Sequence, residues 1–102
     1  MKKYTLSYLP MFESDLAEAW RYITFDLKNP AAADKLVSDT EAAILKRLDA
    51  PESFPKYRSA KEREHPYYRI HIRNFTAWYV VIDTVMEVRR FLYNKRDKEK
   101  LL

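Results

Sequence analysis

Residues 68–82 read Tyr-Arg-Ile-His-Ile-Arg-Asn-Phe-Thr-Ala-Trp-Tyr-Val-Val-Ile, and this stretch decides the fold. Its first half alternates with the two-residue period of a half-buried strand. The alternation directs Tyr68, Ile70 and Ile72 inward and Arg69, His71 and Arg73 outward. Residues 77–82 are a continuous aromatic and β-branched run, which is typical of a central strand covered on both faces. We expect two neighbouring strands, the first with a basic outer face.

Two further strands flank this stretch at a distance along the chain. Asp83 and Thr84 form a turn, and residues 86–93 then alternate again. This alternation places Met86, Val88, Arg90 and Leu92 on one face and Glu87, Arg89, Phe91 and Tyr93 on the other. Residues 4–8 also alternate, and Pro10 ends that opening strand.

Two helices are predicted between the first strand and the second. Over residues 11–28 apolar residues recur at helical spacing, and the stripe consists of Phe12, Leu16, Trp20, Ile23 and Leu27. Asn29 is a suitable N-cap and Pro30 a suitable first residue for the next helix, so that helix must fold back. Its apolar face consists of Ala33, Leu36, Val37, Thr40, Ile44 and Leu48. Residues 51–63, which contain two prolines and no sustained period, are predicted to form a loop.

The predicted fold is therefore α+β, in the order β-α-α-β-β-β. An antiparallel helical hairpin packs on one face of a mostly antiparallel four-stranded sheet and leaves the other face partly open. The 102 residues suffice for one domain, residues 1–102, with a single core. With 47% hydrophobic and 33% charged residues, the chain is neither a disordered tail nor a membrane-spanning protein.

Missing residue types exclude several kinds of chemistry. The chain contains no Cys, which excludes disulfides, thiolate zinc sites and a thiol nucleophile, and suits a reducing cytoplasm. It also contains no Gly, so the glycine-rich loops that bind nucleotide cofactors are absent. The first residues do not form the pattern of a signal peptide. We expect a cytoplasmic protein without a cofactor or a bound metal.

Positive charge is concentrated in the second half. Residues 1–50 contain 7 Lys and Arg against 8 Asp and Glu, whereas residues 51–102 contain 12 against 7. Such asymmetry is compatible with an anionic partner, most often nucleic acid, although many proteins of this net charge have none.

Two segments resemble a known family. Residues 72–81 (Ile-Arg-Asn-Phe-Thr-Ala-Trp-Tyr-Val-Val) and 88–97 (Val-Arg-Arg-Phe-Leu-Tyr-Asn-Lys-Arg-Asp) are similar to the third-strand and C-terminal signatures of the RelE/ParE superfamily, the toxins of type II toxin–antitoxin pairs. The family's tail pattern is matched by Arg90, Leu92, Tyr93, Asn94-Lys95 and Arg96-Asp97. The family usually has Gly in the small pair before the last Arg, and Asn94, which tolerates positive φ, stands there instead. The resemblance extends over essentially the whole chain.

The resemblance implies one of two activities. RelE-like members cleave messenger RNA in the ribosome, whereas ParE-like members bind and poison DNA gyrase. Metal-independent RNA cleavage requires a base, an acid and cations for the developing charge. The density of cations in the second half favours the endoribonuclease; the long hairpin, a tail without an extra helix and the lack of a convincing acid–base pair favour the gyrase inhibitor. We expect messenger RNA cleavage, with gyrase inhibition as the alternative and an inactive member of the fold as a third.

The expected catalytic residues are Arg96, Arg73, His71 and Tyr93, and the expected RNA-binding residues are Arg69, Arg90 and Lys95. The resemblance assigns phosphate stabilisation to Arg96, and a histidine suits proton transfer near neutral pH. Each residue also has a structural interpretation. Arg69 and His71 fit a solvated strand face, Lys95 and Arg96 an ordinary basic tail, and Tyr93 simple packing. Arg90 fits either a buried ion pair or a charge facing the substrate.

The first helix carries aromatic residues outside its core stripe. Tyr22 and Phe25 either bind a partner or pack on the loop at 51–63. The resemblance implies a cognate antitoxin that folds as it wraps the toxin, and an acidic, amphipathic antitoxin would complement the basic half. The other partners expected are the ribosome and messenger RNA, or gyrase in the alternative.

Overall fold

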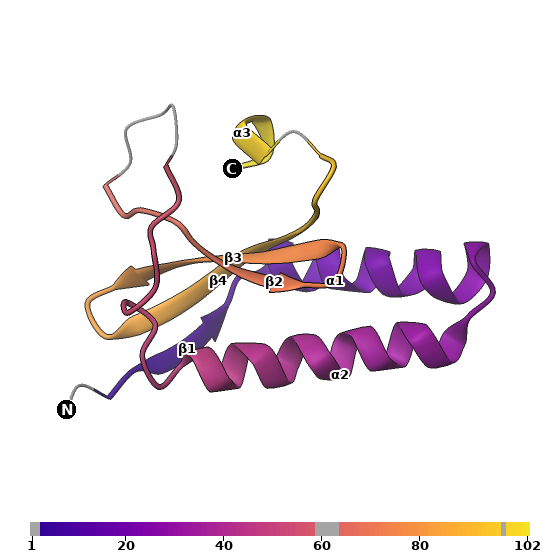
Figure 1. Cartoon of the computed structure of the whole chain (residues 1–102), viewed down its shortest axis with the longest axis horizontal. Coiled ribbons are helices and arrows are strands. Elements are labelled where there is room, and N and C mark those ends of the chain that lie inside the picture. The colour runs from indigo at the N-terminus through magenta and orange to yellow at the C-terminus, as the bar shows by residue number, and fades with distance from the viewer. Residues whose placement is uncertain (1–2, 59–63, 97) are drawn as a thin grey trace.

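Two long helices pack against one face of a four-stranded sheet, as predicted (Figure 1). The computed structural model describes residues 3–58, 64–96 and 98–102. In chain order the elements are β1 (Thr5–Tyr8), α1 (Pro10–Arg21), the π-helical turn η1 (Tyr22–Asp26), α2 (Pro30–Arg47), β2 (Tyr68–Ile72), β3 (Phe75–Ile82), β4 (Val85–Tyr93) and α3 (Lys98–Leu101). Residues 59–63 of the predicted loop, and Asp97, lie outside the described residues.

The sheet has the order β1-β4-β3-β2 and is mostly antiparallel. Only β1 runs parallel to its neighbour, β4, with Leu6 opposite Met86. The strand β3 is central, and its residues Trp78, Tyr79 and Val80 are completely buried, which confirms that both faces of this strand are covered. The side chains of β3 thus contribute to two separate apolar clusters, one on each face of the sheet.

The main cluster lies between the sheet and the helices. Alternate residues of β2 (Tyr68, Ile70 and Ile72) join it, as their period predicts. The second cluster lies on the opposite face, which we expected to be partly open, and is formed by Tyr67, Trp78, Val80 and Leu92. Tyr57 from the loop and Leu101 and Leu102 from the C-terminus pack against it. The C-terminal tail forms a one-turn helix, α3, which the sequence did not predict.

A β-bulge in β4 overturns the predicted faces of that strand. Trp78 pairs with Arg90 but Tyr79 pairs with Val88, so Arg89 has no partner residue in β3. An extra residue reverses the alternation that follows it. Phe91 consequently packs in the cluster beneath the helices and Leu92 in the cluster on the other face. The prediction that Leu92 shares a face with Val88 is wrong for this reason.

The helical hairpin forms as predicted over most of its length. Asn29 caps α2, because its side chain accepts a hydrogen bond from the backbone N–H of Ala32 (3.2 Å). The buried residues of α2 belong to the predicted face: Ala33, Leu36, Thr40 and Ile44. Near its C-terminal end Arg47 donates hydrogen bonds to the backbone oxygen of Arg69 and to the hydroxyl of Tyr79, both at 3.0 Å. These bonds attach α2 to the edge strand β2.

The first helix departs from the prediction after Arg21. There the α-helix gives way to η1, whose wider turn rotates the following side chains away from the original stripe. As a result Leu27, predicted for the core, is 56% exposed. Trp20 is only half-buried, and its indole N–H donates to the carboxylate of Asp34 (2.9 Å). Phe25 packs edge-on against Trp20 at the hairpin tip, far from the loop after α2 (Figure 1).

A substitution that creates a cavity in the main cluster tests the packing of the hairpin. Leu36 is 1% exposed, so Leu36→Ala should lower the free energy of unfolding by about 2–5 kcal/mol. Leu45 in the same helix is 57% exposed, and Leu45→Ala should change the same quantity by no more than about 0.5 kcal/mol. Urea denaturation followed by circular dichroism measures both values. Equal losses for the two variants would contradict the assigned orientation of α2.

Candidate functional site

Tyr93 and Arg96 lie together in a groove at the ends of β3 and β4. Arg96 follows β4 in a turn in which its backbone N–H donates to the carbonyl of Tyr93 (3.0 Å). The groove has a volume of about 480 Å³ and separates these two residues from α1 and η1. We call it the α1 groove, and its lining consists of Asp15, Glu18, Ala19, Tyr22, Ile23, Leu27, Asn74, Phe75, Phe91, Tyr93 and Arg96.

The α1 groove is mainly apolar and aromatic. Phe75 stacks on Phe91 with ring centroids 4.9 Å apart, and the ring of Tyr93 leans against Phe75 at 5.5 Å. From the helical side, Tyr22 and Leu27 remain more than half exposed. Aromatic side chains and arginine are enriched where proteins bind other proteins. Of the four expected catalytic residues, Tyr93 and Arg96 both line this groove, in surroundings that suit a protein partner.

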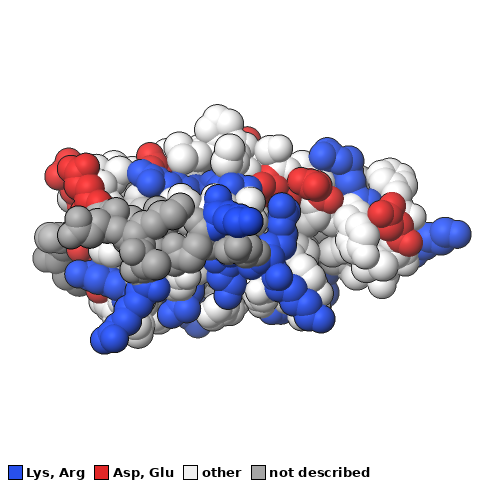
Figure 2. All heavy atoms as spheres, turned by 90° about the horizontal axis from the view of Figure 1, so that it is seen from above, with Lys and Arg blue, Asp and Glu red and all other residues white. Residues whose placement is uncertain are grey.

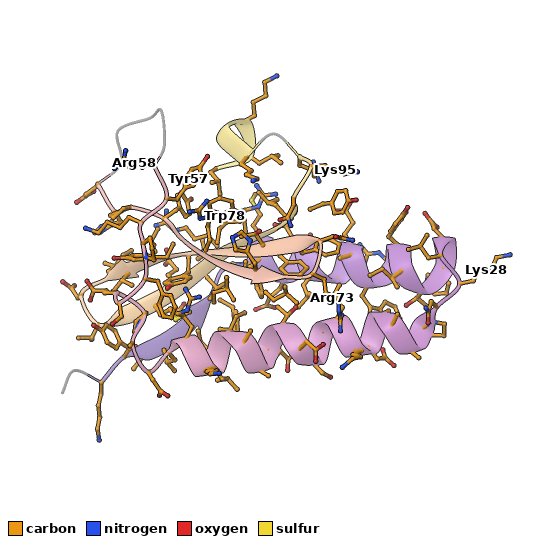
Figure 3. The ribbon with its side chains drawn as sticks, viewed as in Figure 1. Lys28, Tyr57, Arg58, Arg73, Trp78 and Lys95 are labelled. Atoms are coloured by element: carbon orange, nitrogen blue, oxygen red, sulfur yellow. The ribbon has the colours of Figure 1, made fainter. Side chains whose placement is uncertain are left out.

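Arg73 is directed away from the basic strand face where the alternation placed it. The strand β2 ends at Ile72, and Arg73 occupies the following turn with φ 55°, in the left-handed region. Its side chain reaches the other side of the sheet and forms an ion pair with Asp39 of α2 (Figure 3). The prediction that Arg73 faces outward beside Arg69 and His71 is wrong, because the alternation of β2 stops before residue 73.

His71 and Arg69 do lie on the sheet face away from the helices. The Nδ1 atom of His71 is 2.9 Å from the hydroxyl oxygen of Thr76, and that hydroxyl donates to the amide oxygen of Asn94 (2.6 Å). The guanidinium of Arg69 lies over the ring of Tyr57, 5.2 Å from its centroid. His71 is not among the residues that line the α1 groove with Tyr93 and Arg96.

Arg90 is the most extensively bonded of the predicted residues. Its guanidinium donates to both carboxylate oxygens of Asp15 at 2.7 and 3.1 Å and to the backbone oxygen of Leu101 at 2.8 Å. The same carboxylate accepts the backbone N–H of Phe91 (3.0 Å). The hydrogen bonds that Arg90 donates to Asp15 raise the pKa of Arg90, which keeps it charged. Of the two interpretations of Arg90, the structure shows the ion pair, which is partly buried.

Lys95 is exposed in the turn after β4 and lies on the same side of the sheet as Tyr57 and Trp78 (Figure 3). The predicted residues therefore occupy three places: the α1 groove, the face of α2 and the opposite sheet face. Sequence reasoning missed Asp15, Asp39 and Tyr57, which hold Arg90, Arg73 and Arg69 in place. No local signal marks these partners, because each is separated from its arginine by more than ten positions.

Within residues 3–58, 64–96 and 98–102 no three His, Asp or Glu side chains are grouped as metal ligands would be. The helices in the same residues are all too short or too polar to cross a bilayer.

The ion pair of Arg90 should contribute strongly to stability. The two side chains are only 15% and 13% exposed, so Arg90→Ala leaves Asp15 buried without its counterion and should cost about 3–5 kcal/mol of unfolding free energy. The double variant with Asp15→Ala should cost less than the two single losses added together. Arg89→Ala is the matched control, because its pair with Glu87 is more exposed (31% and 20%) and should contribute about 1 kcal/mol or less. Urea denaturation of all four variants measures these free energies. A loss in the double variant equal to the sum of the Arg90→Ala and Asp15→Ala losses would refute the pairing.

His71 should titrate below the usual range of histidine. Burial and then the positive charges of Arg69, Lys98 and Arg47 lower its pKa from the reference value of 6.5. The unfolded chain therefore binds this proton more readily, so the stability contribution is complete above pH 6.5 and declines as the pH falls toward the folded pKa. NMR titration of the imidazole measures the shift. Lys98→Ala should move the pKa upward and Lys28→Ala, at the far hairpin tip, should not; a wild-type pKa at or above 6.5 would contradict this electrostatic environment.

Comparison with known proteins identifies the family. The model of the family described as the ParE toxin of the type II toxin–antitoxin system parDE matches residues 6–98. A solved structure described as the chromosomal ParDE TA system from P. aeruginosa superposes with a TM-score of 0.71. It shares 15% sequence identity and covers 89% of this chain and 96% of that chain, which supports the fold. No curated protein sequence matches the chain. The match over residues 6–98 establishes that the chain belongs to the ParE family of type II toxins.

Proposed function

We propose that this toxin arrests growth by binding DNA gyrase and does not cleave messenger RNA. The observation that carries the proposal is the separation of the expected acid–base residues. A general acid or base must come within about 3 Å of the group it serves, or act through one water. His71 bonds to Thr76 and is not among the residues that line the α1 groove, whereas Tyr93 and Arg96 are. The family match points in the same direction, because gyrase is the target that the resemblance implies for ParE-like members.

The state of the other expected residues also favours a binding protein. The charges of Arg73 and Arg90 are used in ion pairs with Asp39 and Asp15. An arginine that stabilises a developing phosphorane needs its charge directed at the reacting phosphate. The α1 groove instead presents Tyr22, Phe75 and Tyr93 with Arg96 at its margin, which is the composition of a protein-binding surface.

We further propose that a cognate antitoxin neutralises the toxin. The chain has a net charge of +4, and an acidic, amphipathic segment would complement it. Such a segment could fold on the apolar surface of the hairpin tip, where Tyr22, Phe25 and Leu27 are exposed.

Purified protein should inhibit supercoiling of relaxed plasmid by gyrase and leave ribosome-bound messenger RNA intact. Arg96→Ala should raise the concentration for half-inhibition at least about tenfold, because arginine beside aromatic side chains in a groove is a common hot spot. Lys46→Ala removes an exposed charge from α2 and should leave inhibition unchanged. In cells, induction of the toxin should stop DNA synthesis before protein synthesis.

Cleaved messenger RNA together with unimpaired supercoiling would refute gyrase as the target. Full inhibition by the Arg96→Ala variant would refute only the assignment of that residue.

A further inference from the structure

A cluster of cations on the sheet face away from α1 and α2 is not used by the groove or the fold. It consists of Arg58 in the loop after α2, Arg69 and His71 on β2, Lys95 in the turn after β4 and Lys98 on α3, and we call it the basic face. Figure 3 places Arg58 and Lys95 on the same side of the sheet as Tyr57 and Trp78. Viewed from that side, Lys and Arg side chains gather over the middle of the molecule (Figure 2).

These cations differ from three other arginines of the chain in their lack of acidic partners. Arg73, Arg89 and Arg90 each form an ion pair, with Asp39, Glu87 and Asp15 respectively. Among the described residues, by contrast, Arg58, Arg69, Lys95 and Lys98 form none. The lowered pKa of His71, caused by burial and then by Arg69, Lys98 and Arg47, is a local sign of the same excess of positive charge.

One cation of the basic face, Arg69, is held in place by aromatic side chains. Arg69 lies over the ring of Tyr57. That ring packs edge-to-face on Trp78, with ring centroids 4.8 Å apart and an angle of 83° between the ring planes. Trp78 is completely buried in the second cluster. Such a support limits the freedom of the guanidinium and lowers the entropy that it loses on binding an anion.

The chemistry of the face selects among anionic ligands. Proteins that bind single strands stack bases on exposed aromatic rings, but Tyr67 and Trp78 are buried and Tyr57 is partly covered. The one-turn helix α3 is too short to read bases in a groove. The basic face therefore offers only its positive charges for recognition. Such charges suit the phosphates of a double helix and carry no information about sequence.

We propose that the basic face binds the phosphate backbone of duplex DNA through Arg58, Arg69, Lys95 and Lys98, without base specificity. This proposal rests on the proposed function, because a toxin bound to gyrase lies next to the DNA that gyrase holds. None of these four residues lines the α1 groove, so a protein and a duplex can occupy the two surfaces together.

Fluorescence anisotropy with a short labelled DNA duplex tests the proposal over a series of salt concentrations. The triple variant Arg58→Ala, Lys95→Ala, Lys98→Ala should lose at least about tenfold in affinity, and the dependence of log K on log salt should become shallower by about three. The control triple Arg21→Ala, Lys28→Ala, Lys46→Ala removes the same charge from the hairpin and should stay within about twofold of wild type. Melting temperatures establish that both variants fold.

Equal losses in the two triple variants would overturn the proposal, because they would show an effect of net charge alone. It would also be overturned by tighter binding of single-stranded RNA than of duplex DNA, or by binding of a polyglutamate peptide without binding of DNA. Supercoiling inhibition without duplex binding would refute the basic face and leave the gyrase proposal intact. A further outcome is that only the Arg58→Ala, Lys95→Ala, Lys98→Ala variant loses duplex binding, while the wild-type protein leaves supercoiling by gyrase unimpaired. This outcome would support duplex binding by the basic face and refute gyrase as the target.

Discussion

The bulge in β4 is the constraint on which the rest of the structure depends. Because Arg89 is inserted without a partner in β3, the residues beyond it exchange faces, and Phe91 instead of Leu92 completes the core under the helices. The same irregularity lets Arg90 reach Asp15 in α1 and the backbone oxygen of Leu101. One side chain therefore joins the first helix, the central sheet and the C-terminus, and it does so through a buried pair whose two partners depend on each other.

The fold was predictable because long, regular segments carry strong periodicity. The alternation in β2 and the helical spacing in α2 placed Ile70, Ile72, Leu36 and Ile44 in the core correctly. The errors occur where one residue changes the period. The bulge reversed the faces of β4 after Val88, and η1 turned the side chains after Arg21 out of the core stripe. Such insertions are set by contacts between elements, which a local pattern does not contain.

The site was less predictable than the fold, because it depends on partners distant in the sequence. Arg73 and His71 are two positions apart, yet one pairs with Asp39 beneath the sheet and the other contacts Thr76 above it. The neighbouring turn with positive φ at Arg73 separates them. Tyr93 and Arg96 lie in one groove, because one short turn connects them.

The distribution of charge follows from these positions and bears on how the toxin acts. Arginines that lie near acids of the hairpin, Arg73 and Arg90, are neutralised and serve the fold. Cations on the opposite face, such as Arg69, have aromatic support and no acidic partner among the described residues. The molecule thus presents an apolar groove and a positive surface that share no residue. A chain of 102 residues can in this way present one side to a protein and the other to a polyanion, and inhibition of an enzyme bound to its nucleic acid requires no catalytic residue of its own.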